Sequence, residues 1–190
     1  MEHTGSPWGG VGHHVEGGIH ITNLAELDEM DEGRKRELLT FYENQVRSFP
    51  EKAQLHFALG LSYLDLRLYD HALVSLKQAL GKGSREASLY FYIALASLGG
   101  KQPRVLAFTR IKEIESYLEA AVRSEPDNPE ALFLWAIIKY DYYLANGLRV
   151  SPPSIQELLD AANRCRSSRG ELRLIKKYIP MPAPMRQALE

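Results

Sequence analysis

Apolar residues recur at helical spacing from about Leu24 onward, and almost no stretch alternates as a half-buried strand does. Prolines, glycines and polar pairs interrupt the pattern, and each interruption is typical of a helix end or a helix start. The interruptions lie at Phe49-Pro50, Gly81-Lys82-Gly83, Gly99-Gly100, Pro126-Asp127-Asn128-Pro129, Asn146-Gly147, Pro152-Pro153 and Pro180. The pattern therefore predicts an all-α chain made of helical hairpins.

Residues 1–23 do not share this pattern, because they contain six of the glycines and four of the six histidines. Glycine loses the most entropy on ordering, so we expect a flexible extension. Within it, Gly17-Gly18 separates two short runs of strand-forming residues, which indicates a short β-hairpin. The predicted organisation is an extension at 1–23, a helical domain at 24–179 and a proline-rich tail at 180–190.

Helical hairpins prompt a search for a repeat, and one unit of 34 residues runs from Ala53 to the next start at Ala87. Its small and large apolar positions are Leu59, Gly60, Tyr63, Ala72, Leu76 and Ala79. These spacings resemble the tetratricopeptide repeat (TPR) family, although His56 stands where that family prefers tryptophan. A third unit starts at Pro129, and the resemblance covers roughly residues 50–165. It implies a helix-turn-helix solenoid, a right-handed superhelix, with a capping helix at each end.

The second and third units are longer than the family pattern. The second spans 42 residues, and helical spacing from Pro103 onward predicts that its second helix is about two turns longer. The third has about seven extra residues, and we expect its first helix to run to about Asn146. Residues 31–49 and 171–179 are expected to form the capping helices.

The TPR resemblance implies that the first helix of each pair lines a concave surface. The residues at its inward positions are Phe57, Leu61, Phe91, Leu95, Phe133, Ile137 and Tyr140. We interpret them as the partner-binding residues. The aromatic and aliphatic side chains also argue against the carboxylate clamp of cochaperone TPR proteins, which uses lysine, arginine and asparagine.

These first helices are apolar nearly all round, and such helices are normally covered on every side. Three occupants of the groove remain open. The first is the chain itself, through Val15–Ile21 or Ile179–Met185. The second is an amphipathic helix or extended segment of a partner protein. The third is a second copy of the chain.

Charge is unevenly distributed along the 190 residues, although the formal net charge is only −1. Residues 1–50 carry nine acids against four bases, whereas residues 164–190 carry seven bases against two acids. The simpler interpretation of this uneven charge is two solvated helix ends. The alternative is self-association, in which the acidic end of one copy binds the basic end of the next. Nucleic acid is an unlikely partner, because Tyr178 is the only aromatic residue in the basic stretch.

No sequence motif supplies a catalytic site, a phosphate-binding loop or a metal cage. His13, His14 and His20 lack a set of companion ligands, so no metal or cofactor is expected. Arg164 and Arg166 could lower the pKa of Cys165, but an ordinary half-buried cysteine is the simpler interpretation. No apolar run is long enough to cross a membrane and no secretory signal is recognised, so we expect a cytoplasmic protein.

The function expected from these observations is noncatalytic protein–protein interaction. The chain would act as an adaptor or chaperone that binds a hydrophobic or amphipathic segment of a partner in its concave groove, including the regulation of a separately encoded enzyme. The alternative is a structural assembly subunit that self-associates through its acidic N-terminal and basic C-terminal ends.

Overall fold

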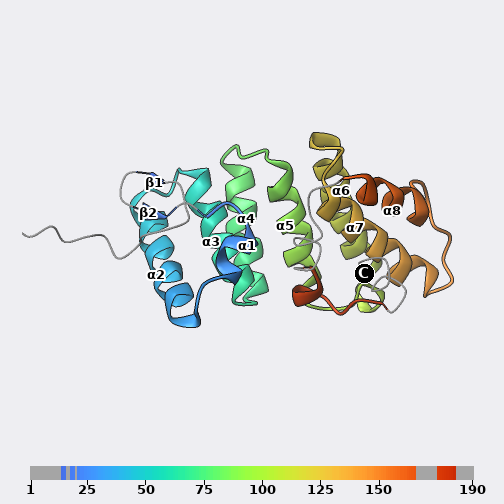
Figure 1. Cartoon of the computed structure of the whole chain (residues 1–190), viewed down its shortest axis with the longest axis horizontal. Helices are drawn as coiled ribbons and strands as arrows, with labels where there is room; N and C mark the ends of the chain where they lie inside the picture. The colour runs from blue at the N-terminus through green and yellow to red at the C-terminus, as the bar shows by residue number, and fades with distance from the viewer. Residues whose placement is uncertain (1–13, 16–17, 20, 166–174, 183–190) are drawn as a thin grey trace, which may run out of the picture.

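A computed structural model describes residues 14–15, 18–19, 21–165 and 175–182. The described chain is an all-α, TPR-like solenoid in which α3 packs on α4, α5 on α6 and α7 on α8, while α2 precedes the first pair (Figure 1). The helices are α1 (Leu24–Asp28), α2 (Glu32–Ser48), α3 (Ala53–Asp65), α4 (Tyr69–Gly81), α5 (Ala87–Leu98), α6 (Phe108–Ser124), α7 (Pro129–Ile138) and α8 (Ile155–Arg164). A 3-10 turn, η1 (Pro103–Val105), and a π-helix, η2 (Lys139–Leu144), complete the stack.

The first helical pair is close because a residue without a side chain lies at its crossing. A Cβ atom placed on Gly60 of α3 would lie only 2.6 Å from Cγ of Leu76 on α4. Leu76, Ala72 and Ala79 are fully buried along the facing side of α4. Ala94 and Ala136 occupy the corresponding inner positions of α5 and α7 and are equally buried. Small residues therefore set the separation of the paired helices, as the repeat pattern predicts.

The extra residues of the second repeat do not form the helix expected from Pro103. Residues 103–105 form η1, Leu106 and Ala107 are extended, and α6 begins only at Phe108. At 17 residues, α6 is about one turn longer than the 13-residue α4. A tertiary contact explains why residues 103–105 do not join α6. The backbone N–H and the Nε of Arg104 both donate to the buried carboxylate of Asp141, over 3.0 and 2.8 Å respectively.

The third repeat has the longer first helix that the sequence predicts. α7 continues without a break into η2, so helical structure runs from Pro129 to Leu144. π-Helical structure is rare and mostly appears as a single turn within an α-helix, and here η2 extends α7 by six residues. The following α8 begins after Ser154, whose side chain and that of Glu157 form a capping box.

Buried polar side chains fix η2 against α6. Glu115 of α6 accepts hydrogen bonds from Tyr143 Oη at 2.6 Å and from Trp135 Nε1 at 3.2 Å. Lys139 is fully buried, and its Nζ donates to the carbonyl of Ser151 over 2.9 Å and lies 3.7 Å from a Glu115 oxygen. Burial raises the pKa of Glu115, but the hydrogen bonds from Lys112, Tyr143 and Trp135 more than offset it and leave that pKa below its usual value.

Outside the helical pairs, two short strands form an antiparallel ladder. β1 (His14–Val15) pairs with β2 (Gly18–Ile19), with His14 opposite Ile19 and Val15 opposite Gly18. At the other end of the chain, residues 175–178 form one helical turn. This turn is the described part of the predicted C-terminal helix, and its contacts lead back to α3 and α4.

Candidate functional site

The predicted groove residues lie on the inner helices of the three repeats. Phe57 and Leu61 are on α3, Phe91 and Leu95 are on α5, and Phe133 and Ile137 are on α7. These three helices contact one another in sequence. All six are buried, whereas Tyr140 of η2 is partly exposed. These six side chains are therefore not open to solvent in the described chain.

One cover is the N-terminal segment, defined here as residues 21–28. Its α1 packs against α3, and its Ile21, Leu24 and Leu27 are buried. The backbone N–H of Ile21 donates to Tyr42 Oη over 3.1 Å, and that of Leu24 donates to Tyr92 Oη over 3.3 Å. These two bonds join the segment to α2 and to α5.

The second cover is the C-terminal segment, defined here as residues 175–181. Its Ile175, Tyr178, Ile179 and Met181 are buried. Tyr69 Oη donates to the carbonyl of Tyr178 over 3.3 Å, which fixes the segment to the start of α4. The chain itself, the first of the three expected occupants, thus lies beside Phe91 and Leu95 through Leu24 and Ile175. Of the stretches named for this role, Ile21 and residues 179–181 belong to these two segments.

The two segments are joined at a group of charged side chains around Asp65, the Asp65 cluster. Lys35 of α2 lies 2.9 Å from one oxygen of Asp65, and Lys177 lies 2.9 Å from the other. Tyr178 Oη donates to the same carboxylate over 3.2 Å, and Lys177 also donates to Asp28 over 2.6 Å. One carboxylate at the end of α3 therefore holds α2 and the C-terminal segment, and Lys177 extends the cluster to α1.

Electrostatics favour the charged form of Asp65 although its side chain is buried. Burial alone would raise the pKa of this carboxyl group, but the hydrogen bonds and charges of Lys177 and Lys35 more than offset the effect. The pKa of Asp65 consequently lies below its ordinary value. The same cluster raises the pKa of Tyr178, through burial first and then through the nearby charge of Asp65.

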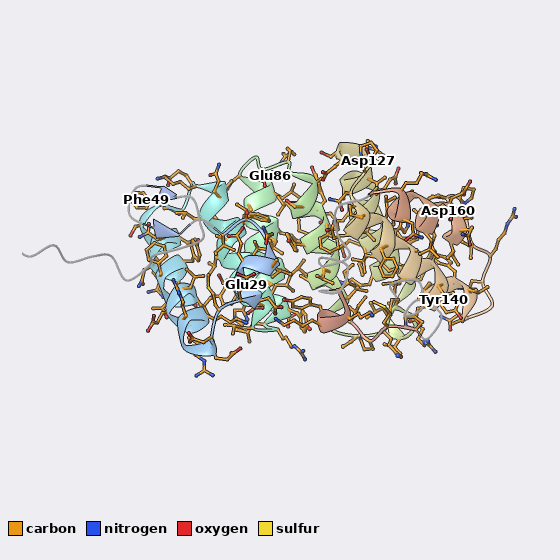
Figure 2. The ribbon with its side chains drawn as sticks, viewed as in Figure 1. Glu29, Phe49, Glu86, Asp127, Tyr140 and Asp160 are labelled. Atoms are coloured by element: carbon orange, nitrogen blue, oxygen red, sulfur yellow. The ribbon has the colours of Figure 1, made fainter. Side chains whose placement is uncertain are left out.

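A cavity of about 230 Å³ remains between the two segments and the inner helices. Its apolar wall includes Leu24 from the N-terminal segment, Phe91 and Leu95 from α5, and Ile175 from the C-terminal segment. Its polar rim includes Glu125, Asp127 and Glu130, which flank the start of α7; Figure 2 labels Asp127 at the turn between α6 and α7. Phe91 and Leu95 are the predicted groove residues that line this cavity, and Tyr140 lies at the far end of the α7–η2 helix (Figure 2).

The remaining candidate groups have structural partners. Nε2 of His56 lies 2.8 Å from the carbonyl oxygen of Pro50 inside the fold. Burial raises the pKa of the Cys165 thiol, and Sγ lies 3.2 Å from the carbonyl oxygen of Ala161, which fits the ordinary half-buried cysteine expected from the sequence. Across the described ranges, no group of three histidine, cysteine, aspartate or glutamate side chains is placed to hold a metal ion. His13 and His20 lie outside the described residues.

Sequence reasoning missed the Asp65 cluster and the cavity. The signal for the cluster was a single carboxylate at the end of a mostly apolar helix, together with the run Lys176-Lys177-Tyr178 between the apolar residues Ile175 and Ile179. Charged residues are rarely buried without a partner, so Asp65 needed one. The pairing joins residues that are more than a hundred positions apart, and local pattern cannot supply it.

Comparison with known proteins places the fold. A solved structure of MamA, a TPR-like helical protein, superimposes with a TM-score of 0.55 at 16% sequence identity, over 84% of this chain and 89% of that chain. No family model matches the sequence, and no curated protein matches it. Within the described residues, none of the helices is both long and apolar enough to cross a membrane. The architecture seen in the helical pairs is therefore that of the TPR-like solenoids.

Proposed function

We propose that this protein is a noncatalytic adaptor or chaperone that binds a hydrophobic or amphipathic segment of a partner protein on its concave face. The anchors are Phe57, Leu61, Phe91, Leu95, Phe133, Ile137 and Tyr140. The partner includes a separately encoded enzyme that the adaptor regulates, and the proposed place of action is the cytoplasm.

The observation that carries this proposal is the cavity beside Phe91 and Leu95. Its volume of about 230 Å³ is below the roughly 300–1,000 Å³ of drug-sized sites but exceeds the roughly 150 Å³ cavity that takes up benzene. It therefore has the size for one large apolar side chain. Its walls come from α5, from the start of α7 and from both chain-end segments, so an incoming side chain would contact all of them.

Energetics indicate how much of the face a partner must use. Full burial of one large apolar side chain contributes about 1.5–3 kcal/mol. Association costs an estimated 4–15 kcal/mol, so the cavity alone cannot give specific binding. A partner segment must add contacts along the rest of the face, where Leu24 and Ile175 now cover the inner helices. Binding thus includes partial displacement of the N-terminal or the C-terminal segment.

A pair of serine substitutions tests the proposal. Ser88 lines the cavity, whereas Ser116 is exposed on α6, so Ser88→Trp fills the site and Ser116→Trp is the matched control. Proteins captured from source-cell lysate by the wild type are quantified beside both variants, after circular dichroism has shown that each is folded. We expect a partner that the wild type and Ser116→Trp capture and Ser88→Trp loses. Equal capture by all three proteins would contradict the proposal.

Self-association through the oppositely charged ends remains a prediction. Lys177 from the basic end and Asp28 from the acidic end pair within one chain at 2.6 Å. This contact uses part of the complementary charge internally, and we therefore favour the adaptor.

A further inference from the structure

Aromatic rings contribute to the wall of the cavity. Phe91 and Tyr92 of α5 and Tyr178 of the C-terminal segment line it together with aliphatic residues. The ring centroids of Phe91 and Tyr92 lie 5.1 Å apart with the rings inclined at 58°, and those of Phe57 and Tyr92 lie 5.9 Å apart at 48°. Both separations are within the range of about 4.5–7 Å in which aromatic side chains attract one another. An aromatic cluster therefore extends from α3 through α5 to the cavity.

The chain itself places an aromatic side chain on this part of the face. Tyr178 is buried in the C-terminal segment, and its hydroxyl donates to Asp65 over 3.2 Å. It shares the cavity wall with Phe91 and Tyr92, while Ile175 of the same segment adds an aliphatic side chain. A side chain that enters the cavity therefore meets aromatic neighbours from α5 and from the C-terminal segment, in continuity with a contact that the chain already makes.

The size of the cavity and its polar groups agree with an aromatic occupant. Its volume of about 230 Å³ exceeds the roughly 150 Å³ of an apolar cavity that takes up benzene, so a phenyl ring fits. The amide side chains that line it are already used within the chain. Asn23 accepts from the backbone N–H of Glu26 over 3.1 Å, and Asn128 accepts from that of Ala131 over 2.9 Å. These amides therefore contribute little to the choice of occupant, which rests on apolar surface and rings.

We propose that the cavity selects an aromatic side chain of the partner segment over an aliphatic side chain of equal size. The ring of Phe91 determines this specificity, because it lies in the cavity wall and packs on Tyr92 of the aromatic cluster. An aromatic pair contributes stabilisation beyond the burial of its apolar area, and an entering ring gains that contribution whereas an aliphatic side chain does not. This inference rests on the proposed function and adds the chemical class of the anchoring side chain to it.

Three uncharged peptides test the preference on the full chain: acetyl-Ala-Phe-Ile-amide and its versions with cyclohexylalanine or leucine in place of phenylalanine. Affinity is measured by titration from the NMR shifts of the methyl groups of Leu24, Leu95 and Ile175, which line the cavity. The cyclohexyl ring has the same carbon skeleton as phenyl and more apolar surface, so the hydrophobic effect alone favours it. We expect the opposite order, with the phenylalanine peptide binding about fivefold more tightly, which corresponds to about 1 kcal/mol.

Two variants with the same substitution locate the effect. Phe91→Leu removes a ring from the wall and keeps an apolar side chain there, whereas Phe108→Leu makes the same change on the exposed side of α6, away from the cavity. The fivefold preference for phenyl over cyclohexyl should fall to about twofold or less in Phe91→Leu and persist in Phe108→Leu. Ser88→Trp should weaken the binding of every peptide, because it fills the cavity. The comparison of the peptides on the wild type decides the preference without any variant.

Three results would overturn the inference. If the cyclohexylalanine peptide binds as tightly as the phenylalanine peptide or more tightly, the cavity selects by apolar area alone, while the apolar site and the proposed function stand. If the preference is unchanged in Phe91→Leu, the ring of Phe91 does not determine it. If none of the peptides shifts the cavity methyl groups at millimolar concentration, the cavity does not receive an aromatic side chain. The proposed function is then judged separately, by the capture of a partner that Ser88→Trp loses.

Discussion

Replacing Asp65 with asparagine removes the charge that holds the C-terminal segment and, through Lys177, the N-terminal segment against the helical stack. The substitution preserves the size of the side chain but leaves the buried ammonium of Lys35 without its near carboxylate, because Glu32 is 3.7 Å away with an exposed side chain. Lys177 retains Asp28 at 2.6 Å. The substitution therefore separates the charge of Asp65 from the packing of its side chain.

The expected cost follows from these remaining contacts. Removing one partner of a buried ion pair typically costs about 3–5 kcal/mol. Because both lysines retain a second carboxylate and asparagine can still accept a hydrogen bond, we expect the lower figure of about 2–3 kcal/mol in the free energy of unfolding. For a chain of this size that corresponds to a fall in Tm of about 5–10 °C.

Urea denaturation followed by circular dichroism measures the stability change, and hydrogen exchange shows where the protein opens. The backbone amides of residues 24–28 and 175–178 should exchange faster in Asp65→Asn than in the wild type, because the cluster joins these segments to α2 and α3. Asp160→Asn on the exposed side of α8 is the control for the loss of one carboxylate. A stability within about 0.5 kcal/mol of the wild type, the usual range of surface changes, would refute the reasoning.

Three further predictions address the helical stack and its ionisable groups. Gly60→Ala should destabilise by about 1–3 kcal/mol because its methyl group would collide with Leu76, whereas Gly81→Ala, with open space around it, should be neutral or stabilising by up to about 1 kcal/mol; equal effects on urea midpoints would contradict the close crossing. The free energy of unfolding should fall below about pH 4, because the pKa of Asp65 is lowered in the folded state and protonation removes its ion pairs. It should also fall above about pH 10, because burial raises the pKa of Tyr42 to about 12 in the folded state and the unfolded chain loses that proton first. A flat profile of stability against pH would exclude both effects. Tyr143→Phe should cost about 1–3 kcal/mol, since Glu115 loses a buried hydrogen bond, and a thermal midpoint equal to that of the wild type would argue against the Glu115 network.

The repeat architecture could be predicted because it depends on residue size at fixed spacing. Gly60 and Leu76 belong to one unit, and their close approach is a local consequence of two consecutive helices packing together. The same argument found the inner row that contains Phe91 and Leu95, and the structure places both on the cavity wall. That these residues bind a partner remains a proposal.

The inserted residues were harder to predict because tertiary contacts decide how a chain absorbs extra length. Helical spacing continues through Pro103, but the contact of Arg104 with the buried Asp141 of η2 holds residues 103–105 in a separate turn. The placement of the two chain-end segments also depends on tertiary contacts. Apolar pattern shows that Ile175 and Tyr178 should be buried, but it does not show that Asp65, about 110 residues away in sequence, is their neighbour.

Photo-crosslinking in the source cells tests the central claim most directly. p-Benzoyl-phenylalanine is placed at Ser88 beside the cavity and, in a second strain, at Ser116 on the exposed side of α6. Mass spectrometry then identifies the crosslinked residue of each product. The account predicts a crosslink from position 88, absent from position 116, to an apolar residue of another protein. Crosslinks from position 88 only to this chain's own residues, or the same products from both positions, would contradict it.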